Sequence, residues 1–159
     1  MANDGDKAIN MNDQSKVKNL CDWPISWQRY TKPGDEYLKP NSSVYISNTE
    51  IDSQINNGNR FFTGTDGLGS HAEVYIENAD LRELFNFDHK EDKREQLIIN
   101  EEKCKSILEL KTLSAFKKNV DENIVTNQER RKLIETARKM KFNDHEKISF
   151  IEQFCGMEF

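Results

Sequence analysis

A short pattern that occurs twice places the strongest constraint on the fold of this chain. Residues 44–51 read VYISNTEI and residues 74–81 read VYIENADL. Three β-forming residues favour a strand with one buried face. The asparagine that follows can accept a hydrogen bond from the free N–H groups that open a helix. Each copy therefore predicts a short strand and then an asparagine-capped helix, and neither copy contains a recognisable set of catalytic residues.

The segment between the two copies predicts a further strand and a tight connection. The first helix should end at Asn57-Gly58, where a left-handed residue is easily accommodated. Residues 59–63 favour a strand, and the run GTDGLGS at 64–70 must turn sharply. This run lacks the spacing of both common phosphate-binding loops. We expect it to connect the two strands of a hairpin.

Composition and charge restrict the class of protein. The chain has 159 residues, of which 35% are hydrophobic and 32% are charged. This balance favours a thin core, polar tails, or a core that a partner completes. The net charge is −5, and residues 1–88 alone carry −6, from 8 basic and 14 acidic side chains. General affinity for nucleic acid is therefore disfavoured.

The three cysteines and the absence of long apolar runs indicate a protein of a reducing compartment. Cys21, Cys104 and Cys155 lie far apart and lack metal-binding spacing, so we expect buried, reduced thiols. Residues 1–19 contain no apolar signal segment, and no window has the composition of a membrane span. We expect a soluble protein that is not secreted and that needs no metal or cofactor.

The chain divides into four segments by composition. Residues 1–19 form a polar arm without regular periodicity, which we expect to be disordered or to gain order only by docking. Residues 20–88 form a β-rich module with two short helices, and residues 89–99 form a charged linker with one further strand at 96–99. Residues 100–159 form a bundle of three or four helices. The predicted fold class is therefore α+β.

Helix caps are the clearest signals in the last segment. Asn100 can cap a helix that buries Cys104, Ile107 and Leu108. Capping-box spacing recurs at Thr126 with Glu129, and as an asparagine variant at Asn143 with Glu146. These signals predict a helical hairpin whose inner faces are apolar.

An aromatic cluster follows the predicted arm. Trp23, Trp27 and Tyr30 lie within one short stretch, in which alternate residues are apolar and Pro24 favours an edge strand. The cluster could be a local core, an anchor in a protein interface, or a platform that stacks on a sugar or base. We select these three residues as the candidate interaction site.

Two other groups of residues suggest chemistry. Basic residues on the predicted 126–155 helices could contact nucleic acid as a helix-turn-helix, although nearby acidic residues cancel much of their charge. These candidate contacts are Arg130, Arg131, Lys132 and Arg138. His71 with Asp66 could act as a base, but no nucleophile is recognisably placed beside it, and a structural histidine is the simpler interpretation.

The chain resembles small accessory structural proteins of tailed bacteriophages. The similarity is carried by WPISW at 23–27, VYISN at 44–48, GTDGLGSHA at 64–72 and TNQE at 126–129, and its layout spans most of residues 20–159. Such proteins often combine a small β-rich module with a helical tail. The resemblance implies a virion component of the head, neck or tail attachment, with no active site to transfer.

The sequence therefore favours a non-enzymatic assembly protein with no catalytic, cofactor or metal residues. Expected partners are capsid, portal or tail subunits, in an oligomeric assembly located in the virion, and in the host cytoplasm while particles form. The alternative is a nucleic-acid-binding regulator that uses the 126–155 hairpin. No membrane association is expected, and nucleic acid is a less favoured partner.

Overall fold

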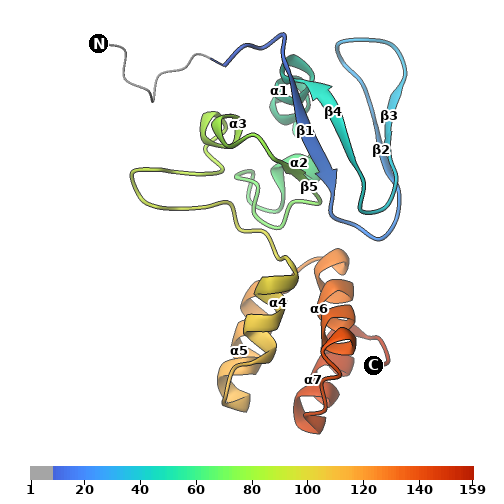
Figure 1. Ribbon diagram of the computed structural model, residues 1–159, viewed down its shortest axis with the longest axis vertical. Coiled ribbons are helices and arrows are strands. Elements are labelled where there is room, and N and C mark those ends of the chain that lie inside the picture. The colour runs from blue at the N-terminus through green and yellow to red at the C-terminus, as the bar shows by residue number, and fades with distance from the viewer. Residues whose placement is uncertain (1–8) are drawn as a thin grey trace. The chain divides into compact units, whose positions relative to one another are not determined.

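The computed structural model describes residues 9–159, so the predicted 1–19 arm lies partly outside the described residues. The chain has an α+β fold with two compact units, one that ends at Leu97 and one that spans Ile98–Phe159 (Figure 1). The boundary between the units falls within the predicted linker at 89–99.

The first unit contains two small sheets and three short helices among its described residues. Its strands are β1 (Gln14–Asn19), β2 (Ile25–Gln28), β3 (Asp35–Leu38), β4 (Ser43–Ser47) and β5 (Val74–Ile76). Its helices are α1 (Asn48–Asn56), α2 (Arg60–Thr63) and α3 (Ala79–Leu84).

The two copies of the repeated pattern flank the same central strand. The three-stranded sheet has the order β4-β1-β5, and both outer strands are antiparallel to β1. One face of this sheet is buried, because Val17, Ile46 and Ile76 pack with Ile51 of α1 and Phe62 of α2. Two strand-and-helix copies thus share one core.

Three polar side chains join the two copies beneath the sheet. The Ser15 hydroxyl on β1 donates a hydrogen bond to the side-chain oxygen of Asn48 (Oδ1, 2.5 Å) and accepts one from the side-chain amide of Asn78 (Nδ2, 3.0 Å). Asn78 also caps α3, as predicted. The first copy differs from the prediction, because Ser47 caps α1 and Asn48 is left free to bind Ser15. The repeated asparagines therefore close the fold in two different ways.

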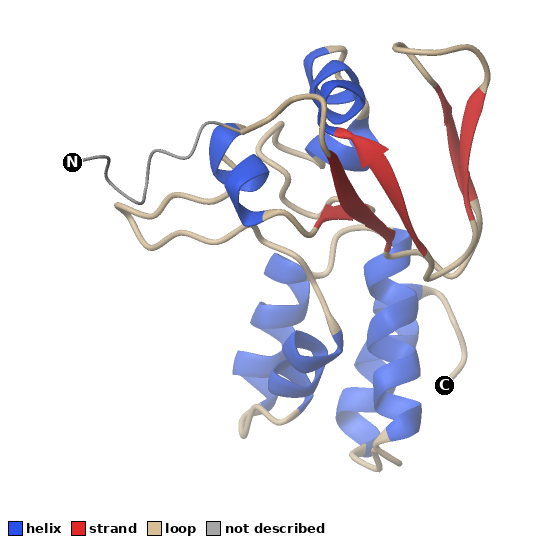
Figure 2. Ribbon diagram, turned by 45° about the horizontal axis from the view of Figure 1, so that its top comes forward, coloured by secondary structure: helices blue, strands red, loops and turns tan. Residues whose placement is uncertain are grey.

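Residues 14–47 form one β-ribbon that bends back on itself. β1 pairs with β4, and β2 pairs with β3 in a separate two-stranded sheet (Figure 2). The bend is held by Asn19, which is fully buried. Its side-chain oxygen Oδ1 accepts from the Cys21 N–H (2.8 Å), and its side-chain nitrogen Nδ2 donates to the backbone carbonyls of Trp23 (2.9 Å) and Lys39 (3.1 Å). The Asn19 side chain thus holds both strands of the ribbon at the bend.

Several predicted elements of this unit are wrong. The arm prediction fails for residues 9–19, since they contain the central strand, and the stretch before it hydrogen-bonds α1 at Asn48 and Thr49. Residues 59–63 are helical, because Asn59 caps α2 by accepting from the Phe61 N–H (3.0 Å). The glycine-rich run therefore joins a helix to a strand, not two hairpin strands. Residues 96–99 form no strand.

The second unit consists of four helices, the upper number predicted, among the residues described here. They are α4 (Glu101–Leu108), α5 (Leu113–Asn123), α6 (Asn127–Lys139) and α7 (His145–Cys155). The caps at Asn100 and Thr126 are confirmed, the latter as a complete capping box. The predicted cap at Asn143 is wrong by one residue, because Asp144 accepts from the Lys147 N–H.

A buried lysine links α7 to the end of α4. Lys147 is 7% exposed, and its amine donates to the carbonyl oxygens of Leu108 (3.2 Å) and Leu110. The amine also lies over the ring of Phe116, 5.3 Å from its centre. Since the last carbonyls of a helix lack partners within it, this amine serves as a remote cap for α4.

Candidate functional site: a cleft beside an open strand edge

The structure separates the three aromatic residues that the sequence nominated. Trp27 is 8% exposed and packs edge-on against Phe62, with ring centres 5.1 Å apart, so it belongs to the core. Trp23 is half-buried against the same core. Only Tyr30 is exposed, at 56%. A shared stacking platform of the three rings is therefore wrong, although Tyr30 remains accessible.

The nominated basic residues also have different surroundings. The Arg130 guanidinium lies over the Phe154 ring, 5.5 Å from its centre, and is partly buried. Arg138 is exposed and donates to the Glu158 carbonyl (2.8 Å). Arg131 is exposed and Lys132 is half-buried. Arg130 thus serves packing within the second unit.

The glycine-rich loop uses its acidic residue to hold its own shape. The Asp66 carboxylate accepts from the N–H groups of Leu68 (2.8 Å) and Ser70 (3.2 Å) and from the Ser70 hydroxyl (2.6 Å). Burial acts to raise the pKa of Asp66, but these hydrogen bonds lower it overall. His71 is buried with a positive φ, and its N–H donates to the Leu97 carbonyl (2.9 Å). The Asp66 contacts are therefore those of a structural turn.

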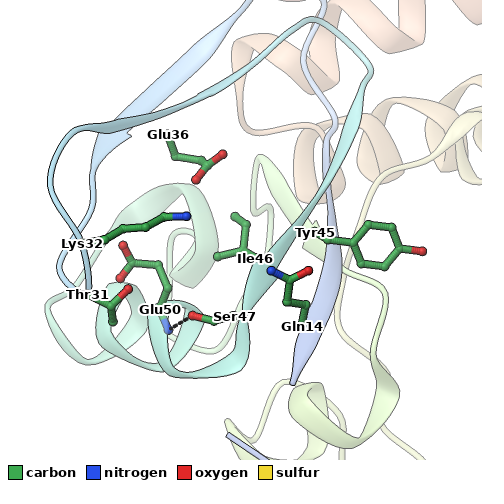
Figure 3. Close-up of a pocket in the computed structure, with 8 residues that line it drawn as sticks. All are labelled: Gln14, Thr31, Lys32, Glu36, Tyr45, Ile46, Ser47 and Glu50. Atoms are coloured by element: carbon green, nitrogen blue, oxygen red, sulfur yellow. Dashed lines mark hydrogen bonds between the residues drawn. The ribbon is translucent and has the colours of Figure 1, made fainter. Parts of the chain in front are cut away.

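A hollow of about 150 Å³ lies where the ribbon bends back, and we call it the β3–β4 cleft. It lies between the returning hairpin and β4, above the first turn of α1 (Figure 3). The turn at 39–42 joins β3 to β4, and the two strands bound the cleft on opposite sides. The residues that line it are Gln14, Thr31, Lys32, Glu36, Tyr45, Ile46, Ser47 and Glu50.

The backbone of β4 is unpaired on the side of this cleft. The backbone N–H of Asn19 donates to the Ser42 carbonyl (2.8 Å), and the backbone N–H of Asn48 donates to the Asp13 carbonyl (2.8 Å), which fixes the register with β1. In an antiparallel pair, the hydrogen-bonding direction alternates along the strand. The N–H and C=O groups of Ser43 and Tyr45 therefore point away from β1. They have no hydrogen-bond partner within residues 9–159.

Charged side chains surround the cleft. Glu50 is 2% exposed, and its two oxygens accept only the Tyr30 N–H (2.8 and 3.2 Å) in the part of the chain described. Glu36 is paired with Arg29 at 3.0 Å. The Lys32 amine extends into the same hollow, whereas the Tyr45 ring points away from it (Figure 3). The floor of the cleft thus contains a buried carboxylate that contacts no cation of residues 9–159.

Sequence reasoning missed this cleft and two of its neighbouring tyrosines. Tyr37 on β3 and Tyr45 on β4 are 57% and 66% exposed. Within the VYI pattern, the tyrosine between two inward-facing residues must face outward, since side chains alternate along a strand. That signal could have identified Tyr45 as a surface aromatic.

Comparisons with known proteins identify no relative. No protein-family model, curated protein sequence or solved structure matches this chain. Within the described residues, no helix has both the length and the apolar composition needed to cross a bilayer. The same residues contain no group of three or more His, Cys, Asp or Glu side chains arranged to hold a metal ion.

Proposed function

We propose that this protein is a non-enzymatic assembly protein that acts through protein–protein contacts. Its setting is a tailed-bacteriophage virion, where it contacts capsid, portal or tail subunits. The resemblance of the sequence to small accessory virion proteins is the reason for proposing this setting. The exposed tyrosines of the bent ribbon support the mode of action.

Three tyrosines carry the proposal, and together we call them the tyrosine surface. Tyr30, Tyr37 and Tyr45 are exposed at 56%, 57% and 66%. Tyr37 and Tyr45 lie on the outward faces of β3 and β4, and Tyr30 follows β2. Tyrosine is enriched in protein interfaces, because it buries a large apolar ring and still satisfies its hydroxyl group. These three exposed rings are therefore the side chains of the ribbon that we expect a partner to contact.

Co-expression tests the proposal. The chain is produced with the products of the genes beside its own, and complexes are sized by chromatography with light scattering. We expect a complex of defined mass that is lost in the triple variant Tyr30→Ser, Tyr37→Ser, Tyr45→Ser. Leu84→Ser is the matched control, because Leu84 is 51% exposed but lies on α3. Tryptophan fluorescence confirms that each variant is folded.

Two results would overturn the proposal. One is a chain that stays monomeric with every neighbouring product. The other is salt-dependent binding to duplex DNA that is lost in Arg130→Glu with Arg131→Glu, which would favour a regulator instead. The position of the gene gives an independent check, since a place among portal, capsid and tail genes agrees with a virion component. A place in an early regulatory block does not.

A further inference from the structure

We propose that the β3–β4 cleft takes one extended segment of a partner polypeptide, which adds to β4 as a strand and brings a basic side chain to Glu50. This inference rests on the proposed function, because it names the partner chemistry of the same assembly protein. Three features of the cleft support it: its open backbone, its size and its charge.

The open backbone of β4 has the pattern that an added strand requires. Ser43 and Tyr45 direct their N–H and C=O groups away from β1 at a two-residue spacing, and Tyr45 lines the cleft. An added strand forms hydrogen bonds with the N–H and C=O groups of alternate residues, and these main-chain hydrogen bonds supply affinity. Exposed edges are usually protected by charged side chains, proline or bulges. β4 has the sequence SVYIS, which contains none of these protections.

The size of the cleft favours a single segment over a second copy of this chain. Pairing of two β4 edges would also bring in β1 and β5 of the second copy, since the sheet has the order β4-β1-β5. The hairpin of β2 and β3 already occupies the space beyond the cleft (Figure 3). A hollow of about 150 Å³ accommodates a short length of one chain, not the edge of another sheet.

The charge of the cleft favours a basic side chain in that segment. Glu50 is buried, and its carboxylate accepts only one backbone N–H among the described residues. A carboxylate that is already buried is stabilised when a cation comes into contact with it. Lys32 is the cation that lines the cleft, opposite Glu50 and Glu36. Residues 1–97 carry 11 basic and 17 acidic side chains, so the surrounding charge also attracts a basic segment.

Labelled peptides test this inference on the full chain. The probe is a capped seven-residue peptide that alternates threonine and valine around a central arginine. The comparison peptide has the same sequence with a central glutamate instead. Binding is followed by fluorescence anisotropy. We expect the arginine peptide to bind at least about tenfold more tightly, as a desolvated charge pair requires. Because both peptides meet the same protein, this comparison needs no protein variant.

Two variants locate the site on β4. Tyr45→Pro removes the N–H that faces the cleft. It should weaken binding of the arginine peptide by about tenfold or more, because proline cannot donate a hydrogen bond to an added strand. Tyr45→Thr removes the same ring but keeps the N–H, so its affinity should stay within about threefold of the wild type. In the complex, amide exchange at Tyr45 should slow.

Three outcomes would overturn the inference: no binding of the arginine peptide at millimolar concentration, equal binding of the two peptides, or equal effects of proline and threonine at position 45. None of these decides the proposed function. If the complex with neighbouring gene products still depends on the tyrosine surface, the assembly role stands and only the inserted segment is refuted. If the arginine peptide does not bind and the complex with neighbouring gene products does not form, the inference and the proposed function are both refuted.

Discussion

The bend of the ribbon should depend on one side chain, and Asn19→Ala tests this. Asn19 is fully buried, and three of its hydrogen bonds measure 2.8, 2.9 and 3.1 Å. A hydrogen bond contributes about 0.5–1.5 kcal/mol net, so the loss of three predicts a fall of about 3 kcal/mol in the free energy of unfolding. For a unit of this size, that loss lowers Tm by more than about 12 °C.

Urea unfolding followed by tryptophan fluorescence measures this loss of stability in the first unit of the chain. Both tryptophans of the sequence, Trp23 and Trp27, lie in the first unit, so the signal reports only that unit. The midpoint should fall, and the slope with urea should stay unchanged if the surface exposed on unfolding is the same. The control is Asn57→Ala, because the Asn57 amide makes one exposed hydrogen bond, to the Ser53 carbonyl (2.7 Å).

A loss below about 1 kcal/mol for Asn19→Ala would refute the reasoning, because it would mean that water replaces the amide at little cost. An equal loss for Asn57→Ala would also refute it. If the prediction holds, the same variant should weaken peptide binding in the β3–β4 cleft, since the bend places the hairpin beside β4.

The remaining predictions concern buried and charged side chains. Lys147→Met should destabilise the second unit by about 2–3 kcal/mol, because it removes charged hydrogen bonds to two carbonyls. Lys139→Met, which removes an exposed ion pair, should cost less than about 0.5 kcal/mol. Thermal unfolding followed by circular dichroism compares the two variants. The lowered pKa of Asp66 means that its ionised form stabilises the fold above pH ~4 and that this contribution is lost as pH falls through the folded pKa. The stability gap between the wild type and Asp66→Asn should therefore narrow on acidification, and urea midpoints from pH 6 to 3 would show it; a constant gap would contradict it. Burial raises the pKa of Cys104 to about 12 and of Cys155 to about 11, so both thiols should react with a chromogenic disulfide at pH 8 only after unfolding. Rapid labelling of the native protein would contradict this.

The sequence predicted those elements whose signals are local. The repeated VYI strands follow from residue propensity, and the capping box at Thr126 follows from spacing within one turn of helix. β1 escaped prediction because two of its three buried side chains, Ser15 and Asn19, are polar. Their burial is favourable only because partners distant in sequence satisfy them, and no local pattern reveals those partners.

The candidate site was harder to predict than the fold, for the same reason. The β3–β4 cleft depends on a bend that Asn19 fixes through contacts with Cys21, Trp23 and Lys39. Alternation along the chain did predict a one-sided strand around Trp27, and its buried face is now seen to lie in the core. The pattern alone could not distinguish a core tryptophan from an interface tryptophan, because both are large and apolar.

The two copies of the repeat end at opposite edges of one sheet, and only one of those edges is left open. β5 has three residues, and the Arg82 guanidinium donates to the Ile76 carbonyl (2.7 Å) at its outer edge. β4 has five residues, and no side chain among the described residues donates to the outward carbonyls of Ser43 or Tyr45. Short length and a blocking cation are common ways to protect a strand edge. Since the same VYI pattern is protected at β5 and open at β4, the difference lies in the surroundings, and it points to β4 as the edge available for a partner.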